Sequence, residues 1–182
     1  MAFQQTDIPE VILIHPDVHR DERGYFLETY QKERYFSNGV AYEFVQDNQS
    51  SSIKGTLRGL HYQLGKPQGK LVRVLRGEIF DVAVDLRRKS PFFGKWVGEV
   101  LSAENQQQLW IPPGFGHGFY TLSDQADVFY KATDYYYPEG ERCIRWDDAE
   151  IGIDWPISGS DGPIVSEKDS LGSNLADAEV YL

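Results

Sequence analysis

The sequence predicts an all-β fold, either a sandwich or a barrel, with a few short peripheral helices. Short apolar or alternating runs recur along the whole chain, with Gly, Pro, Asn and Asp between them. Aromatic residues, which favour strands, make up 14% of the chain. No long run with the period of an amphipathic helix separates the short runs. Many short strands at close spacing are typical of β-sandwiches and β-barrels.

The individual elements follow from this pattern. In chain order, strands are predicted at 11–14, 25–30, 44–48, 56–63, 70–75, 78–86, 96–101, 108–111, 117–122 and 128–133. Arg76-Gly77 lies between two of them and predicts a tight hairpin, because Gly adopts positive φ readily. Residues 31–36 form a candidate short helix. Residues 174–181 form a second one, with Asn174 as its N-terminal cap.

Length and composition indicate one globular domain over residues 1–182. The net charge of −10 argues against a nucleic-acid polymer as partner, although local Arg and Lys side chains still permit a small anionic ligand. The only cysteine, Cys143, excludes an intramolecular disulfide and suits a reducing compartment. The first ten residues lack a signal-peptide pattern, and no apolar run approaches the roughly 20 residues of a membrane helix. We therefore expect a cytoplasmic protein without membrane contact.

Two segments carry the residues that matter for chemistry. Residues 55–63 read Gly-Thr-Leu-Arg-Gly-Leu-His-Tyr-Gln, and Lys70 and Gly77 follow. Residues 112–117 read Pro-Pro-Gly-Phe-Gly-His. Together the segments resemble the two motifs of the cupin superfamily. The resemblance implies a cupin-type jelly-roll barrel.

The departures from the cupin motifs concern metal binding. Gln63 stands where the motif has its second His, and Lys70 lies near the position of the Glu. A divalent cation prefers neutral imidazoles and a carboxylate, whereas an ammonium group repels it. His61 and His117 alone are too few ligands for a tight site. We expect no metal and no other cofactor. One alternative is a metal-dependent cupin enzyme. Another is that His61 and His117 have no function beyond hydrogen bonding in the interior.

Without a metal, His61 and Lys70 suit proton chemistry. A neutral imidazole is a general base near neutral pH. An ammonium group beside a carbonyl oxygen stabilises a developing enolate. With a tyrosine as proton donor on the opposite face, the set suits proton abstraction next to a ketone.

A closer resemblance extends over most of the chain, to the dTDP-4-dehydrorhamnose 3,5-epimerase family. The matching stretches are 21–28, 44–48, 55–63, 68–74, 77–87, 112–120, 130–138 and 166–169. The resemblance implies His61 as catalytic base, Asp169 as the carboxylate that pairs with it, and Tyr130 as general acid. It implies Lys70 beside the C4 oxygen of the sugar, with Asp81 as the companion of Lys70.

The same resemblance implies a nucleotide site and a homodimer. Arg23 and Arg58 match pyrophosphate contacts, and guanidinium groups pair well with phosphate. The remaining matches are His117 close to the pyrophosphate, Gln46 and Asn48 around the nucleotide, and Phe26, Glu28 and Tyr136 around the thymine. The family exchanges N-terminal strands and some ligand contacts across the dimer. The expected substrate is dTDP-4-dehydro-6-deoxy-D-glucose, epimerised at C3 and C5.

Three questions stay open at this point. Arg58 and His61 have opposite parity along one strand, so a regular strand would point them to opposite faces unless Gly59 allows a bulge. Asp81 alternates with Phe80 and Val82, which by itself suggests a solvent-facing residue. The alternative functions are a single-centre epimerase of another deoxysugar pathway and a non-catalytic sugar-nucleotide binding module. The module should lack one of the three predicted proton-transfer residues, and none is missing.

Overall fold

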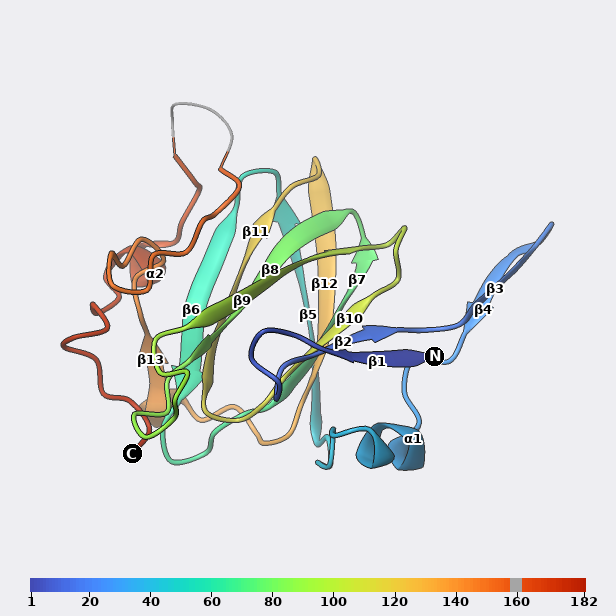
Figure 1. Ribbon diagram of the computed structural model, residues 1–182. Helices are drawn as coiled ribbons and strands as arrows, with labels where there is room; N and C mark the ends of the chain where they lie inside the picture. The colour runs from blue at the N-terminus through green and yellow to red at the C-terminus, as the bar shows by residue number, and fades with distance from the viewer. Residues whose placement is uncertain (158–161) are drawn as a thin grey trace.

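The structure, a computed structural model, describes residues 1–157 and 162–182. Its strands form a two-layered barrel, with short helices at the periphery (Figure 1). The strands are β1 (Ala2–Gln5), β2 (Ile12–His15), β3 (Val18–Asp21), β4 (Gly24–Leu27), β5 (Gln46–Ile53), β6 (Leu57–Gln63), β7 (Lys70–Arg76), β8 (Glu78–Asp85), β9 (Trp96–Ser102), β10 (Gln108–Ile111), β11 (Phe115–Thr121), β12 (Gln125–Ala132) and β13 (Glu141–Cys143). The helices are α1 (Lys32–Ser37), the 3₁₀ turn η1 (Pro138–Gly140) and α2 (Glu167–Ser170).

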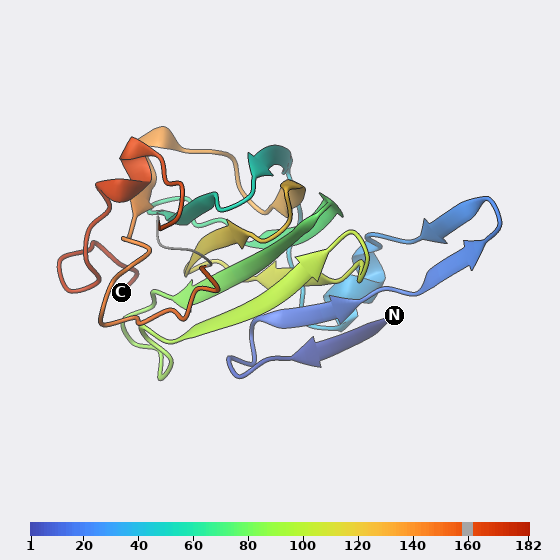
Figure 2. The same cartoon turned by 90° about the horizontal axis from the view of Figure 1, so that it is seen from above.

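Two antiparallel sheets build the barrel, as the all-β prediction requires. One contains six strands in the order β1-β2-β10-β7-β12-β5, and the other contains five in the order β13-β6-β11-β8-β9. Figure 2 shows the two layers from above. Their inner faces bury an apolar core that includes Val72, Leu109 and Phe119. Two layers of antiparallel strands around one apolar core are the arrangement that the cupin-type prediction requires, so the predicted fold class is confirmed.

Each predicted strand coincides in part with an observed one, but the sequence pattern does not indicate β1, β3 or β13. These are short elements of three or four residues without a buried alternating face. β1 and β13 lie at sheet edges, and β3 belongs to a separate two-stranded sheet with β4. Such strands have little hydrophobic signal because only one neighbour pairs with them and packing does not dictate their side chains.

The outer face of the five-stranded sheet is also covered. A second apolar cluster includes Val82 of β8 together with Trp155 and Leu175 of the C-terminal region. Alternate residues of β8 therefore enter two different cores. This arrangement overturns the solvent-facing interpretation of Asp81, which is 0% exposed and points into the barrel.

The C-terminal tail is not helical, so the helix predicted at 174–181 is wrong. Its backbone pairs with the barrel instead. The amide of Tyr181 donates to Leu86, and the carbonyl of Tyr181 accepts from Arg88. Leu175 is buried in the outer cluster. The carbonyl of Asn174 accepts a turn hydrogen bond from the amide of Asp177. These tertiary hydrogen bonds and contacts outweigh the weak local helix preference of eight residues.

The predicted hairpin at Arg76-Gly77 is wrong as well, although the glycine does turn the chain. Gly77 has φ of 76°, and a Cβ there would lie 2.0 Å from the carbonyl oxygen of Gln125. The strands on either side, β7 and β8, belong to different sheets. Arg76-Gly77 is therefore a corner at which the chain crosses from one layer of the barrel to the other.

A bulge in β6 determines on which face of the strand Arg58 and His61 lie. β11 pairs with β6 so that His117 faces His61 and Phe119 faces Arg58. One residue of β11 thus lies opposite two of β6, and Gly59 has φ of 118°. The extra residue restores Arg58 and His61 to the same face of the strand.

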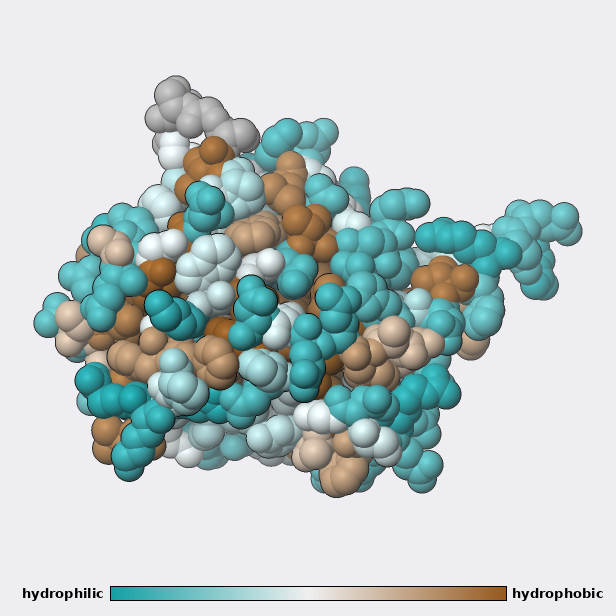
Figure 3. All heavy atoms as spheres, in the orientation of Figure 1, coloured by the Kyte–Doolittle hydropathy of each residue, from teal (hydrophilic) through white to brown (hydrophobic). Residues whose placement is uncertain are grey.

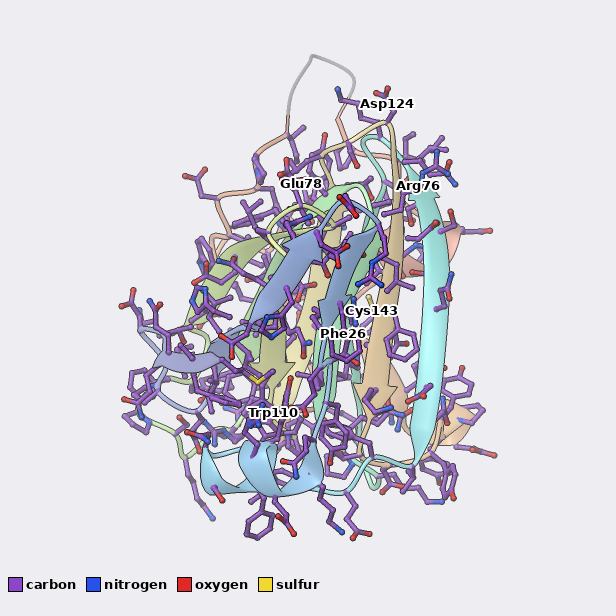
Figure 4. All side chains as sticks on the ribbon, turned by 90° about the vertical axis from the view of Figure 1, so that its right-hand side faces the viewer. Phe26, Arg76, Glu78, Trp110, Asp124 and Cys143 are labelled. Carbon is purple, nitrogen blue, oxygen red and sulfur yellow. The ribbon has the colours of Figure 1, made fainter. Side chains whose placement is uncertain are left out.

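The β3–β4 hairpin projects away from the barrel in both ribbon views. Figure 4 looks toward this hairpin and labels Phe26 on it, with Trp110 near α1. Trp110 is buried in a third cluster with Tyr35 of α1. The face seen in Figure 3 is mainly hydrophilic, with hydrophobic side chains in scattered groups. Among the described residues, no helix is long and apolar enough to cross a membrane.

Candidate active site

His61 and Asp169 form a dyad at the edge of the barrel. Nε2 of His61 lies 2.7 Å from Oδ1 of Asp169. β6 supplies the histidine, whose side chain is 33% exposed, and α2 supplies the aspartate, whose side chain is 5% exposed. Ser166 caps α2 by accepting from the amide of Asp169, which places the carboxylate at the strand.

The protonation state of the dyad follows from its hydrogen bonds. Burial alone would raise the pKa of Asp169, but the bonds from His61 and from the amide of Gly59, 3.2 Å from Oδ2, hold that pKa below its ordinary value. An ionised carboxylate only accepts hydrogen bonds, so Nε2 of His61 carries the proton. In the neutral tautomer that this hydrogen bond selects, Nδ1 has the lone pair that a general base requires.

Lys70 of β7 and Tyr130 of β12 lie beside this dyad. The ammonium nitrogen of Lys70 is 5.7 Å from the centroid of the Tyr130 ring. Burial lowers the pKa of Lys70 to about 8, against the opposing charges of Asp81 and Glu141. Burial also raises the pKa of Tyr130, so its hydroxyl keeps its proton at neutral pH. The pair thus offers a cation and a neutral proton donor.

His117 and Asp81 form a second pair, which is buried. Nε2 of His117 lies 2.8 Å from Oδ1 of Asp81. Burial lowers the pKa of His117 despite the carboxylate beside it. Asp81 therefore hydrogen-bonds to His117 rather than to Lys70, which it influences through charge. Its other oxygen, Oδ2, is buried and has no hydrogen-bond partner in the described part of the chain.

Several predicted residues line one pocket of about 90 Å³. His61, Lys70, Tyr130 and Tyr136 are among its lining residues. The pocket is also lined by five residues that the sequence interpretation does not assign to the site, namely Tyr62, Gln63, Gln68, Phe115 and Glu141.

Glu141 links the pocket to α2. It accepts from the hydroxyl of Tyr136 at 2.6 Å and pairs with Lys168 at 2.6 Å. Burial alone would raise the pKa of Glu141, but these two hydrogen bonds hold it below its ordinary value. Lys168 lies inside the matched stretch 166–169, so the motif contained a signal for it. Glu141 follows the stretch 130–138 by three residues and had none.

A larger pocket of about 420 Å³ opens on the other side of His61. Arg58, Lys168 and Asp169 also line it. The guanidinium of Arg58 donates to the hydroxyl of Ser52 at 3.0 Å and to the carbonyl of Ser51 at 3.3 Å. It forms no ion pair with a carboxylate of residues 1–157 or 162–182, so its charge is available to an anion.

Gln46 and Asn48 lie on β5 and join the site through Tyr136. Gln46 Nε2 donates to Asn48 Oδ1 at 3.0 Å. The amide of Tyr136 donates to Gln46 Oε1 at 2.9 Å. These contacts tie the edge strand to the loop that carries Tyr136.

The remaining three predicted residues do not join the site within one chain. Arg23 and Phe26 belong to the projecting β3–β4 hairpin, where the Arg23 side chain is 85% exposed and Phe26 is 72% exposed. Within residues 1–157 and 162–182, Arg23 pairs only with Asp21 of the same turn, at 2.5 Å. Glu28 accepts from Arg34 at 2.7 Å. None of the three lines the pockets around His61.

The residues at the cupin ligand positions do not fit a metal. Gln63 is fully engaged, since its oxygen accepts from the amide of Tyr137 and its nitrogen donates to two backbone carbonyls. Lys70 presents an ammonium group where a carboxylate ligand would be needed. His117 already uses Nε2 to bind Asp81. This donor set disfavours a divalent cation.

Comparisons with known proteins agree with one another. The sequence profile described as dTDP-4-dehydrorhamnose 3,5-epimerase matches residues 5–177. A relative of that name from Pseudomonas aeruginosa is 56% identical over 100% of this chain and 99% of its own. A crystal structure of a 3,5-epimerase from Legionella pneumophila, in complex with dTDP-4-keto-L-rhamnose, has a TM-score of 0.94 and 51% identity over 98% of this chain and 94% of that chain. A 3′-monoepimerase from Streptomyces bikiniensis, in complex with dTDP-quinovose, has a TM-score of 0.87 and 30% identity over 94% of this chain and 87% of that chain.

Proposed function

The chain belongs to the dTDP-4-dehydrorhamnose 3,5-epimerase family, and from this we propose the assignment of its residues to the reaction. The enzyme is an isomerase that inverts C3 and C5 of dTDP-4-dehydro-6-deoxy-D-glucose and forms dTDP-4-dehydro-β-L-rhamnose. Both protons are α to the C4 ketone, which acidifies them. The His61–Asp169 dyad, with a free ring nitrogen facing away from the carboxylate, is the observation that carries the assignment.

His61 removes each proton. The ionised Asp169 orients the ring and stabilises the imidazolium that forms, because the charge that appears on His61 lies 2.7 Å from a carboxylate oxygen. The mechanism therefore needs no metal-bound base.

Lys70 stabilises the enolate at the C4 oxygen. A buried cation interacts strongly with a developing negative charge, since little water screens it. The ring of His117 lies 6.3 Å from the ring of Tyr130, and a neutral His117 leaves Lys70 as the cation of this pocket at pH values below about 8. We assign His117 and Asp81 to support of this region rather than to proton transfer.

Tyr130 returns a proton from the face opposite to His61. Its hydroxyl remains protonated because burial raises its pKa. Inversion requires removal and delivery on different faces, and the two side chains come from different sheets, β6 in one and β12 in the other. Each face of the sugar thus meets one of the two groups.

The pyrophosphate binds Arg58 in this scheme, beside the larger pocket and without a competing carboxylate. Gln46, Asn48 and Tyr136 contact the nucleotide. Glu141 lines the smaller pocket and Lys168 lines the larger one, and the ion pair between them links the two. An enzyme of this kind works in the cytoplasm, where the free Cys143 stays reduced.

The site is completed by a second copy of the chain. Arg23, Phe26 and Glu28 lie on or next to the projecting hairpin and line neither pocket around His61 of their own subunit. An exposed phenylalanine and a guanidinium on a two-stranded arm suit a neighbour's nucleotide site, by stacking and by charge-assisted hydrogen bonds. We therefore propose a homodimer in which each N-terminal arm completes the partner's site.

One experiment tests the function directly. The enzyme is incubated in D₂O with dTDP-4-dehydro-6-deoxy-D-glucose, and the label position and stereochemistry are read by NMR. The expected product carries deuterium at C3 and C5, both inverted. Label at both positions with inversion at C3 alone would instead identify a monoepimerase, as named for the relative from Streptomyces bikiniensis. The higher identity to 3,5-epimerases favours the double inversion.

A further inference from the structure

Cys143 lies next to the catalytic dyad without a role in the mechanism. β13 pairs with β6 so that Cys143 is directly opposite His61. Residues opposite each other in an antiparallel pair project from the same face of the sheet. The thiol therefore stands beside the imidazole. In Figure 1, β13, the strand of Cys143, lies on the opposite side of the barrel from the projecting β3–β4 hairpin.

Three elements bring three different ligand types to one point. β6 supplies His61, β13 supplies Cys143 and α2 supplies Asp169. One potential ligand atom from each lies within 4.8 Å of the other two. Asp169 is buried, whereas His61 and Cys143 are partly exposed. A cation can thus reach the cluster from solvent and still find a carboxylate that burial keeps in place.

We propose that Cys143, His61 and Asp169 form a binding site for a thiophilic divalent cation, of which Zn²⁺ and Cd²⁺ are the chemical type, and that occupation of this site inhibits the enzyme reversibly. The inhibition rests on the proposed role of His61 as base. The binding itself does not.

The donor set favours this class of cation. Thiolate, imidazole and carboxylate are the ligands of zinc sites, which have three protein ligands and a fourth position for water when they remain open. Magnesium and calcium prefer oxygen ligands only, so they should not compete. The site shares only His61 with the cupin ligand positions, whose other members do not fit a metal.

Binding exchanges a proton for the cation. Burial raises the pKa of the Cys143 thiol to about 12, so the thiol is protonated in the free enzyme. A bound cation displaces this proton to solvent and forms the metal–sulfur bond. The cation binds His61 through the lone pair of one ring nitrogen. Binding at Nδ1 occupies the lone pair that the base uses, whereas binding at Nε2 replaces the hydrogen bond to Asp169 and moves the Nε2 proton to Nδ1. In either case the ring has no free lone pair to act as a base for the substrate.

Because Cys143 is the only cysteine of the chain, a spectroscopic test is unambiguous. Chelator-treated enzyme is titrated with Cd²⁺ in the absence of nucleotide, and the ultraviolet charge-transfer absorption of a cadmium–thiolate bond is recorded. We expect saturation at one cation per chain. Cys143→Ala should abolish the absorption. His61→Asn should keep the thiol but raise the dissociation constant about tenfold or more, since even outer-shell partners of metal ligands contribute that much.

Activity provides the second readout, at free Zn²⁺ concentrations set by a metal buffer. Zn²⁺ should inhibit the parent enzyme, and chelator should restore full activity. Cys143→Ala should keep the parent's basal rate and resist inhibition at least about tenfold better. Mg²⁺ at the same concentrations is the control and should have no effect.

Three results would overturn the proposal. One is the absence of the Cd²⁺ absorption. Another is saturation at half a cation per chain with no effect of His61→Asn, because that result is expected when one ion bridges the thiols of two chains. The third is equal Zn²⁺ inhibition of parent and Cys143→Ala enzymes. A site that binds Cd²⁺ as expected while turnover continues unchanged would leave the site intact and contradict the role of His61 as base.

Discussion

The ammonium nitrogen of Lys70 lies 5.7 Å from the centroid of the Tyr130 ring, inside the pocket that His61 also lines. The proposed enolate stabiliser and the proposed proton donor therefore address the same bound sugar. Burial affects the two groups in opposite ways. It lowers the pKa of Lys70 to about 8 and raises that of Tyr130.

Lys70 should limit activity at alkaline pH. Its charged form is required, so kcat/KM, which reports on the free enzyme, should fall as pH rises through about 8. Lys70→Met should lower kcat about 10²–10³-fold, the usual loss for one electrostatic donor. Lys70→Arg keeps the charge at all accessible pH values, so its alkaline limb should move up by about one pH unit or more. If the arginine variant showed the same alkaline limb as the parent, Lys70 would not be the group that limits activity at alkaline pH.

His61 and Tyr130 should separate proton removal from proton delivery. His61→Ala is expected to abolish both product formation and deuterium uptake from D₂O. Tyr130→Phe keeps the ring and the base, so deuterium exchange at C3 or C5 should continue while inversion falls about 10²–10⁴-fold. NMR of the recovered sugar distinguishes the two variants. Inversion of both centres by Tyr130→Phe at the parent rate would contradict its role as acid.

Arg58 should act within its own subunit and Arg23 across the dimer. Either alanine variant should weaken dTDP binding in calorimetry, by about 1.5–3 kcal/mol for a charge-assisted hydrogen bond. Mixed dimers of Arg23→Ala and His61→Ala chains contain one intact site, so random mixing should restore about a quarter of parent activity.

The matched control replaces Arg23→Ala by Arg58→Ala. In that mixed dimer every site carries a defect, because Arg58 and His61 share one strand, and no activity should return. Equal behaviour of the two mixtures, or an active monomer in light scattering, would contradict the shared site.

Asp169→Asn should affect both rate and stability. The rate should fall about 10²–10⁴-fold because an amide supports the wrong imidazole tautomer. Asp169 has a pKa below its ordinary value in the folded enzyme, so its ionised form stabilises the fold above the unfolded pKa, and this contribution is lost as pH falls through the folded pKa. Urea unfolding should therefore show the variant about 1–3 kcal/mol less stable at neutral pH, with a smaller difference in acid. If the difference in unfolding free energy stayed constant down to low pH, the ionisation of Asp169 would not contribute to stability.

Gly59→Ala should disturb the bulge that brings Arg58 and His61 together. A Cβ at Gly59 would lie 2.5 Å from the Cα of Gly118, at a φ of 118°. We expect a loss of about 2–5 kcal/mol in unfolding free energy and weaker dTDP binding in any folded fraction. Gly152→Ala is the control, since it also has positive φ but only a 3.8 Å neighbour, and should cost about 1–2 kcal/mol. Equal effects of the two substitutions would exclude close packing as the reason for Gly59.

The sequence by itself determined the β-class, most of the strand pattern, the family and the candidates for the reactive side chains. These depend on local alternation and on motif spacing, both of which are visible in one chain. His61, Lys70 and Tyr130 could therefore be selected from strands 56–63, 70–75 and 128–133 before any contact was known. Local patterns also misled where long-range pairing competes with them. The tail 174–181 has helix-forming residues, yet its backbone pairs with Leu86 and Arg88.

The tertiary structure decided which side chains meet. The bulge at Gly59 placed Arg58 on the face of His61, and the two covered faces of the five-stranded sheet placed Asp81 beside His117 instead of in solvent. The direction of the β3–β4 hairpin left Arg23 outside its own site, and strand register placed Cys143 next to the dyad. Each of these depends on pairing between segments that are distant in the chain. Their relative positions are set by packing and by the hydrogen-bond requirements of buried backbone, and neither is expressed in a local run of residues.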